Sequence, residues 1–215
     1  GFTINMTNGT ASILGDGTFK NGPLSEIVVG GTSAASFNTG AFLNEGLVDL
    51  TPGSTLNLLG TSNTLTLGNG SILAGEGILN GNVIVNAGGL IAPAWAVTGI
   101  LTINGSLTVN PGGNLLFDLE LPGPIGQGGI HDLLNVTGGN INGPITLNGG
   151  NLFVQWQGNV NANNATLINS VTTFVSCDSS AAPCLTQNAG LTLLEPLGAT
   201  GSSVGIVPGL GATGS

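Results

Sequence analysis

The sequence predicts an all-β protein built as a single parallel β-helix, or β-solenoid, with coils of roughly 20–25 residues. Three observations lead to this fold class. Short runs alternate aliphatic residues with Thr or Asn, as in Leu107-Thr-Val109. Asn-Gly or Gly-Gly pairs end these runs and supply the backbone freedom that tight corners require. No segment has helical periodicity, so stacked coils remain as the way to pair such short strands in parallel.

The repeats follow one another at recognisable spacings. Segment 105–114 (GSLTVNPGGN) repeats segment 81–90 (GNVIVNAGGL) after 24 residues, with Val83 matching Leu107 and Val85 matching Val109. A third copy over 143–152 lies 38 residues further on, and a looser copy covers 47–56. The larger second spacing predicts an inserted loop over 121–131. The repeats therefore indicate successive coils of one solenoid.

Further strands are expected on both sides of the repeats. In chain order, the sequence pattern predicts strands over residues 2–6, 27–29, 65–67, 101–103, 107–109, 116–121, 172–175 and 191–194. We expect the solenoid domain to span residues 1–197. The Gly-rich tail, 198–215, contains the sequence GATGS twice, and we expect it to pack on a neighbouring subunit by adding a strand to an open sheet edge.

The composition excludes several classes of function. The chain has 215 residues, a net charge of −9, one Lys (Lys20) and no Arg. Nucleic-acid binding needs cations that replace counterions, so no nucleic-acid partner is expected. Handling of phosphate through Arg or Lys is excluded for the same reason. No run of 18 apolar residues occurs, so we do not expect the chain to span a membrane with a helix.

The two cysteines point to an oxidising compartment. Cys177 and Cys184 flank the short polar loop Asp-Ser-Ser-Ala-Ala-Pro. A disulfide between them would close a small hairpin-like loop, whereas the alternative is two free thiols. No second cysteine pair completes a zinc site. We expect the disulfide and an extracellular or cell-surface location.

The stretch 64–93 (TLTLGNGSILAGEGILNGNVIVNAGGLIAP) resembles the passenger-associated repeat of autotransporter adhesins. The continuation 99–118 and the segment 132–138 (DLLNVTG) resemble such passengers too, and the resemblance covers about residues 45–156. It implies a β-solenoid displayed at the cell surface. It implies no particular activity, because these repeats serve many surface proteins.

Two groups of residues have the composition of chemical sites. His131 next to Asp132 could form a base with its orienting carboxylate, but a lone His in a Gly-rich loop is more often a solvated turn residue. Asp118 and Glu120 share a strand face at a spacing that some glycosidases use, but we expect them to be solvated, with Phe117, Leu119 and Leu121 pointing inward. No catalytic residue, cofactor or metal ligand is therefore predicted. The ten acidic residues look scattered along the chain.

These observations favour a structural function. We expect an extracellular protein that self-associates into a fibre or surface lattice, because residues 1–14 carry no charged side chain to prevent end-to-end pairing. The alternative is an adhesin or autotransporter-like passenger that binds glycans or neighbouring cells. A polysaccharide-degrading enzyme is a third possibility, which the lack of basic residues disfavours.

Overall fold

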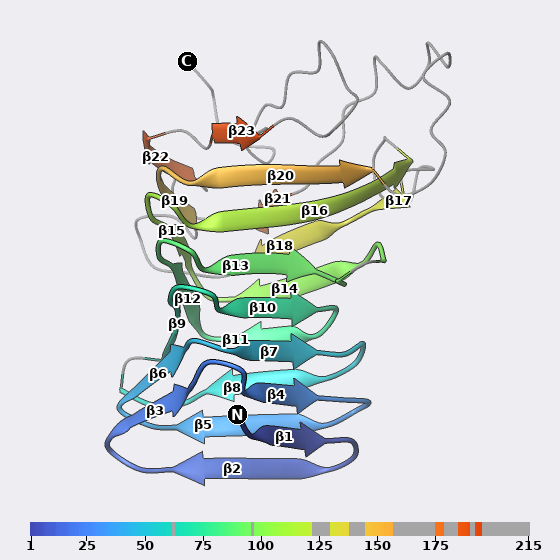
Figure 1. Ribbon diagram of the computed structural model, residues 1–215. Helices are drawn as coiled ribbons and strands as arrows, with labels where there is room; N and C mark the ends of the chain where they lie inside the picture. The colour runs from blue at the N-terminus through green and yellow to red at the C-terminus, as the bar shows by residue number, and fades with distance from the viewer. Residues whose placement is uncertain are drawn as a thin grey trace.

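The computed structural model is a parallel β-solenoid with three strands in each coil, which confirms the expected fold class (Figure 1). It describes residues 1–61, 63–95, 97–121, 130–137, 145–156, 175–178, 185–189 and 192–194. Successive coils stack along one axis, with the N-terminal coil at one end. The described part of the chain contains strands and turns, and no helix there could cross a lipid bilayer.

The three parallel sheets, here called A, B and C, form the three walls. Sheet A contains β1 (Thr3–Met6), β4 (Glu26–Val29), β7 (Leu47–Leu50), β10 (Ile72–Gly75), β13 (Leu90–Pro93), β16 (Asn114–Leu121), β20 (Asn151–Trp156) and β23 (Thr192–Leu194), with β17 (Ile130–His131) antiparallel to β16. Sheet B contains β2 (Thr10–Leu14), β5 (Ala34–Asn38), β8 (Thr55–Leu58), β11 (Ile78–Asn80), β14 (Ile100–Asn104), β18 (Leu133–Thr137) and β21 (Val175–Asp178). Sheet C contains β3 (Thr18–Asn21), β6 (Ala41–Asn44), β9 (Thr64–Leu67), β12 (Asn82–Val85), β15 (Leu107–Val109), β19 (Ile145–Asn148) and β22 (Leu185–Ala189).

The core consists of aliphatic side chains that stack in rows along the axis. Each strand has period-2 alternation, so every second residue points inward. Leu56, Leu79 and Ile103 lie in register on β8, β11 and β14, and all three are fully buried. Equivalent rows from sheets A and C complete one continuous hydrophobic cluster. Burial between coils, rather than within one coil, therefore stabilises the fold.

The register confirms the closest sequence repeats. Val83 pairs with Leu107 and Val85 with Val109, and Leu107 then pairs with Ile145 across the larger spacing. The looser copy lies at a different corner of its coil: Leu47 belongs to sheet A and pairs with Ile72, whereas Val83 and Leu107 belong to sheet C. At each corner of a coil, a strand leads through a glycine-containing turn into the next strand. The same sequence pattern therefore recurs at more than one corner.

Asparagines line the corners in hydrogen-bonded ladders. Asn80 donates to Asn57 and Asn104 donates to Asn80, each over 2.7 Å. In a second ladder Asn110 donates to Asn86 and Asn148 to Asn110, across steps of 24 and 38 residues. The longer step follows from the insertion between β16 and β18, which folds back on β16 as β17. Side-chain amides suit this role because each carries both donors and an acceptor.

Several sequence predictions lie outside the described residues. These are the tail 198–215, the start of the expected strand 172–175, and Cys184, the second half of the expected disulfide. The backbone of Cys177 lies in β21, in register with Val136. The disulfide and the domain division stay predictions.

Candidate functional site

Unequal corner lengths create a recess between sheets A and B. The corner from β10 to β11 contains only Glu76 and Gly77. The corner one coil below runs from Thr51 to Ser54, and the corner one coil above runs from Ala94 to Gly99. A short corner between two longer ones leaves a recess in the wall, which we call the notch.

Two glycines make the short corner possible. Gly75 has φ 107°, and a Cβ there would lie 2.0 Å from the carbonyl oxygen of Leu50. A Cβ on Gly77 would lie 2.7 Å from Cβ of Leu50. This close approach lets the N–H groups of Glu76 and Gly77 both donate to that same carbonyl, over 2.7 and 2.9 Å. Glycine at both positions therefore holds Glu76 at the floor of the notch.

The notch has a volume of about 340 Å³ and a mostly apolar lining with two carboxylates. Trp95 and Val97 belong to the upper corner and are 51% and 59% exposed. Ala94 and Trp95 have φ values of 57° and 28°, which L-residues rarely adopt. The residues that line the notch are Leu47, Asp49, Thr51, Pro52, Ala74, Gly75, Glu76, Ala94, Trp95 and Val97.

Negative charges surround the notch. Burial raises the pKa of Asp49 above its usual value, and the negative charge of Glu26 on β4 raises it further. The carboxylate of Glu76 belongs to the same lining. A Cβ built on Gly99 would come within 1.9 Å of Oε1 of Glu76, so this carboxylate rests against the backbone of the upper corner.

A buried carboxyl group, Asp132, lies behind the upper corner. It accepts hydrogen bonds from the N–H groups of Gly99 and Asp118, both over 2.8 Å. Desolvation raises its pKa to about 7, the charges of Asp118 and Glu76 add to this effect, and the two N–H groups oppose it. Asp132 thus fastens the upper corner of the notch to β16.

The sequence interpretation of this region was wrong in one respect. His131 and Asp118 were expected to be solvated, but they are only 4% and 3% exposed. The insertion returns as β17 and pairs antiparallel with β16, and both residues are buried in this arrangement. Nδ1 of His131 lies 2.7 Å from the main-chain oxygen of Asp132, whereas the Asp132 carboxylate accepts the backbone bonds described above. The side chain of Glu120 lies outside the described residues.

The acidic residues are also less scattered than the sequence suggested. Five of the ten either line the notch or act electrostatically on Asp49 or on Asp132, the carboxyl group behind it. They are Glu26, Asp49, Glu76, Asp118 and Asp132. Within the described ranges, no three His, Cys, Asp or Glu side chains form a group that could hold a metal ion. The acidic residues of the described part of the chain are therefore concentrated in this region.

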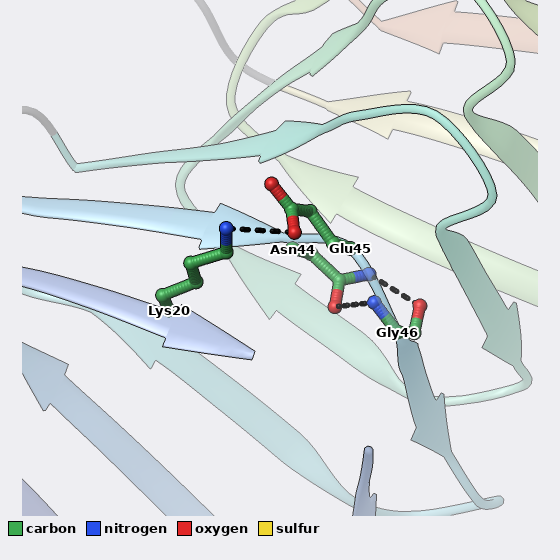
Figure 2. A network of polar contacts seen from close by, with 4 residues as sticks. All are labelled: Lys20, Asn44, Glu45 and Gly46. Atoms are coloured by element: carbon green, nitrogen blue, oxygen red, sulfur yellow. Dashed lines mark hydrogen bonds and ion pairs between the residues drawn. The ribbon is translucent and has the colours of Figure 1, made fainter. Parts of the chain in front are cut away.

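The single lysine lies elsewhere and already has a partner. Nζ of Lys20 on β3 is 2.7 Å from Oε2 of Glu45, at the corner that follows β6 (Figure 2). Sequence reasoning missed Glu76 and Trp95 altogether. The signal that could have found them is the Gly-Glu-Gly corner beside the longer segment 94–99, once the coils are aligned.

The fold and the corner ladders define the chain as a parallel β-solenoid of three-stranded coils with an acidic notch in one wall. No family model, no curated protein and no solved structure matches the chain. The resemblance to autotransporter passengers thus rests on the residues quoted for it.

Proposed function

We propose that this protein is an extracellular structural protein whose solenoids join end to end into a cell-surface fibre or lattice. The observation that carries the proposal is the open face of the first coil. Ile4, Met6, Ile13 and Phe19 belong to the hydrophobic cluster but are only partly buried. Their partners one coil further on, in the same register, are Ile27, Val29, Phe37 and Phe42, which are between 0 and 3% exposed. One more coil laid on β1, β2 and β3 would bury the first set equally well.

The edge strands of this end have little protection against pairing. β1, β2 and β3 each form the outer edge of their sheet. Proteins commonly blunt such edges with charged side chains, especially Lys. β1 and β2 carry no charged side chain, and on β3 the charge of Lys20 is paired with Glu45. The edge can therefore accept strands from another copy without burying an unpaired charge.

Aromatic rings add apolar surface at the same end. The ring of Phe19 lies 4.9 Å from that of Phe37 and 5.1 Å from that of Phe42, both nearly edge to face. Phe19 is the outermost and remains partly exposed. Such a cluster favours association because aromatic rings bury large areas at little entropic cost.

We further propose that the chain is a passenger of the autotransporter type, as its repeats suggest. The alternative function, adhesion to glycans, is supported by the exposed indole of Trp95 at the rim of the notch. Binding of the isolated chain to a glycan array tests that alternative. The proposal assigns no catalytic activity, and hydrolysis of acidic polysaccharides by the pure protein would contradict it.

Sedimentation velocity over a range of concentrations tests the self-association. We expect the wild-type protein to form species that grow with concentration. Met6→Lys places a charge in the open core and Asn5→Lys places one on the outer face of the same edge strand. Both should sediment as monomers. Thr66→Lys, with the same charge change on the side wall, should assemble like the wild type.

The proposal is wrong if the wild type stays monomeric at its highest soluble concentration. It is also wrong if Thr66→Lys abolishes assembly as fully as Asn5→Lys, since overall charge would then be the cause. Asn5→Lys leaves the core untouched, so its effect cannot be attributed to misfolding of the first coil.

A further inference from the structure

We infer that the notch binds a lysine or arginine side chain presented by a partner protein. This inference goes beyond the proposed self-association and does not require it. The site is the recess over Glu76, between the corner 51–54 and the corner 94–99. The proposed end-to-end contact uses β1, β2 and β3, whereas the notch is lined by residues of β7, β10 and the neighbouring corners.

The charges of the notch call for a cation. Its lining holds the carboxylates of Asp49 and Glu76, and Glu26 lies close enough to repel Asp49. The lining contains no basic residue. An ammonium or guanidinium group in the notch would be attracted to both carboxylates and would offset the repulsion between Glu26 and Asp49, in a partly desolvated site where such attraction is strong.

The shape and the apolar lining suit a long basic side chain. Pro52, Ala74 and Val97 offer apolar surface to a hydrocarbon stem, as Lys and Arg stems require. Trp95 presents its exposed indole at the same rim. The face of an indole attracts a cation more strongly than any other aromatic side chain does. The notch thus combines negative charge, apolar surface for the stem and an aromatic ring, the three features that suit a lysine or arginine side chain.

The partner has to be a different protein. This chain has one Lys and no Arg, and the Lys is paired with Glu45. A second copy therefore has no free basic side chain to offer. A neutral sugar could stack on Trp95, but it would leave the negative charges of Asp49 and Glu76 uncompensated. Charge complementarity accordingly selects a cationic segment of another chain.

Isothermal titration calorimetry with acetyl-tetralysine amide tests the inference. We expect binding that weakens as salt rises from 50 to 200 mM. Glu76→Gln and Asp49→Asn should each lower the affinity about tenfold, and Trp95→Ala about fivefold. The matched control is Asp16→Asn, which removes one negative charge at an exposed turn far along the chain from the notch. It should change the affinity less than twofold.

Two further probes separate the possible outcomes. Acetyl-tetraglutamine amide and cellotetraose should bind at least tenfold more weakly than the lysine peptide. The inference is overturned if the lysine peptide does not bind, or if Asp16→Asn weakens it as much as Glu76→Gln and Asp49→Asn do. Preferential binding of cellotetraose would also overturn it and would support the glycan alternative. Glu76→Gln and Asp49→Asn are nearly isosteric and lie in separate coils, so one remains informative if the other misfolds.

Discussion

Replacing Asn44 with alanine removes the best-connected side chain at the corner between sheets C and A. Asn44 is fully buried at the end of β6. Its Nδ2 donates to the carbonyls of Gly46 and Ile72 over 3.0 and 3.1 Å. Its Oδ1 accepts from Nδ2 of Asn21 over 2.7 Å and from the N–H of Gly46 over 3.2 Å. Figure 2 shows the reciprocal contact with Gly46.

The magnitude follows from these four bonds. A hydrogen bond contributes about 1 kcal/mol net, and a buried group that loses its partner costs at least as much. Asn44→Ala should therefore lower the free energy of unfolding by about 4 kcal/mol. Asn21→Ala removes two bonds, one to Asn44 and one to the carbonyl of Leu47. We expect it to cost about 2 kcal/mol.

Asn104→Ala is the matched control. Asn104 also lies in a corner ladder, with Asn80 and Thr137 as partners, but its side chain is exposed. Water replaces its lost bonds, so the cost should stay below about 1 kcal/mol.

Urea denaturation of dilute protein, followed by circular dichroism, gives the three free energies. Hydrogen exchange at β6, β7 and β10 locates the effect within the structure. The reasoning is refuted if Asn44→Ala and Asn104→Ala lower the free energy of unfolding by amounts that differ by less than about 0.5 kcal/mol. Burial would then not determine how much a ladder hydrogen bond stabilises the fold.

Three further predictions test the core, the short corner and the buried carboxyl group. Phe42→Ala, at 3% exposure, should lower the free energy of unfolding by about 3–5 kcal/mol, whereas Phe2→Ala, at 45% exposure, should cost less than about 1 kcal/mol; equal urea midpoints would contradict this. Gly75→Ala should lower the free energy of unfolding by more than about 3 kcal/mol and Gly9→Ala by only about 1 kcal/mol. Both glycines have positive φ, but only Gly75 faces a backbone atom. Thermal denaturation checks the difference. Because the folded pKa of Asp132 is raised to about 7, the native protein retains a proton that the unfolded chain releases near pH 4. The free energy of unfolding should therefore fall as pH rises between these values and level off above. Asp132→Asn should remove this pH dependence. The prediction is contradicted if the urea midpoints of Asp132→Asn change between pH 4 and 8 as steeply as those of the wild type.

The repeats were sufficient to predict the coils. The match of Val83 and Val85 to Leu107 and Val109 gave the correct register, because one aliphatic row can be buried only if successive coils align. The larger spacing before Ile145 correctly placed an insertion. The looser copy over 47–56 falls at a different corner, because the corners of a coil share one local pattern and only long-range pairing tells them apart.

The candidate site could not be read from the sequence in the same way. The notch exists because corners of different length become neighbours after stacking, a relation between Glu76 and Trp95 that no local pattern contains. The burial of Asp118 and His131 depends on the insertion folding back against β16, which is a tertiary event. The acidic residues look scattered along the sequence, yet stacking of the coils brings half of them to one region.

Cryo-electron microscopy of the concentrated, purified protein tests the end-to-end account most directly. The account predicts filaments in which the strand spacing of about 4.8 Å continues without interruption from one copy into the first coil of the next. Separate rods, with β1, β2 and β3 facing solvent in every particle, would contradict it.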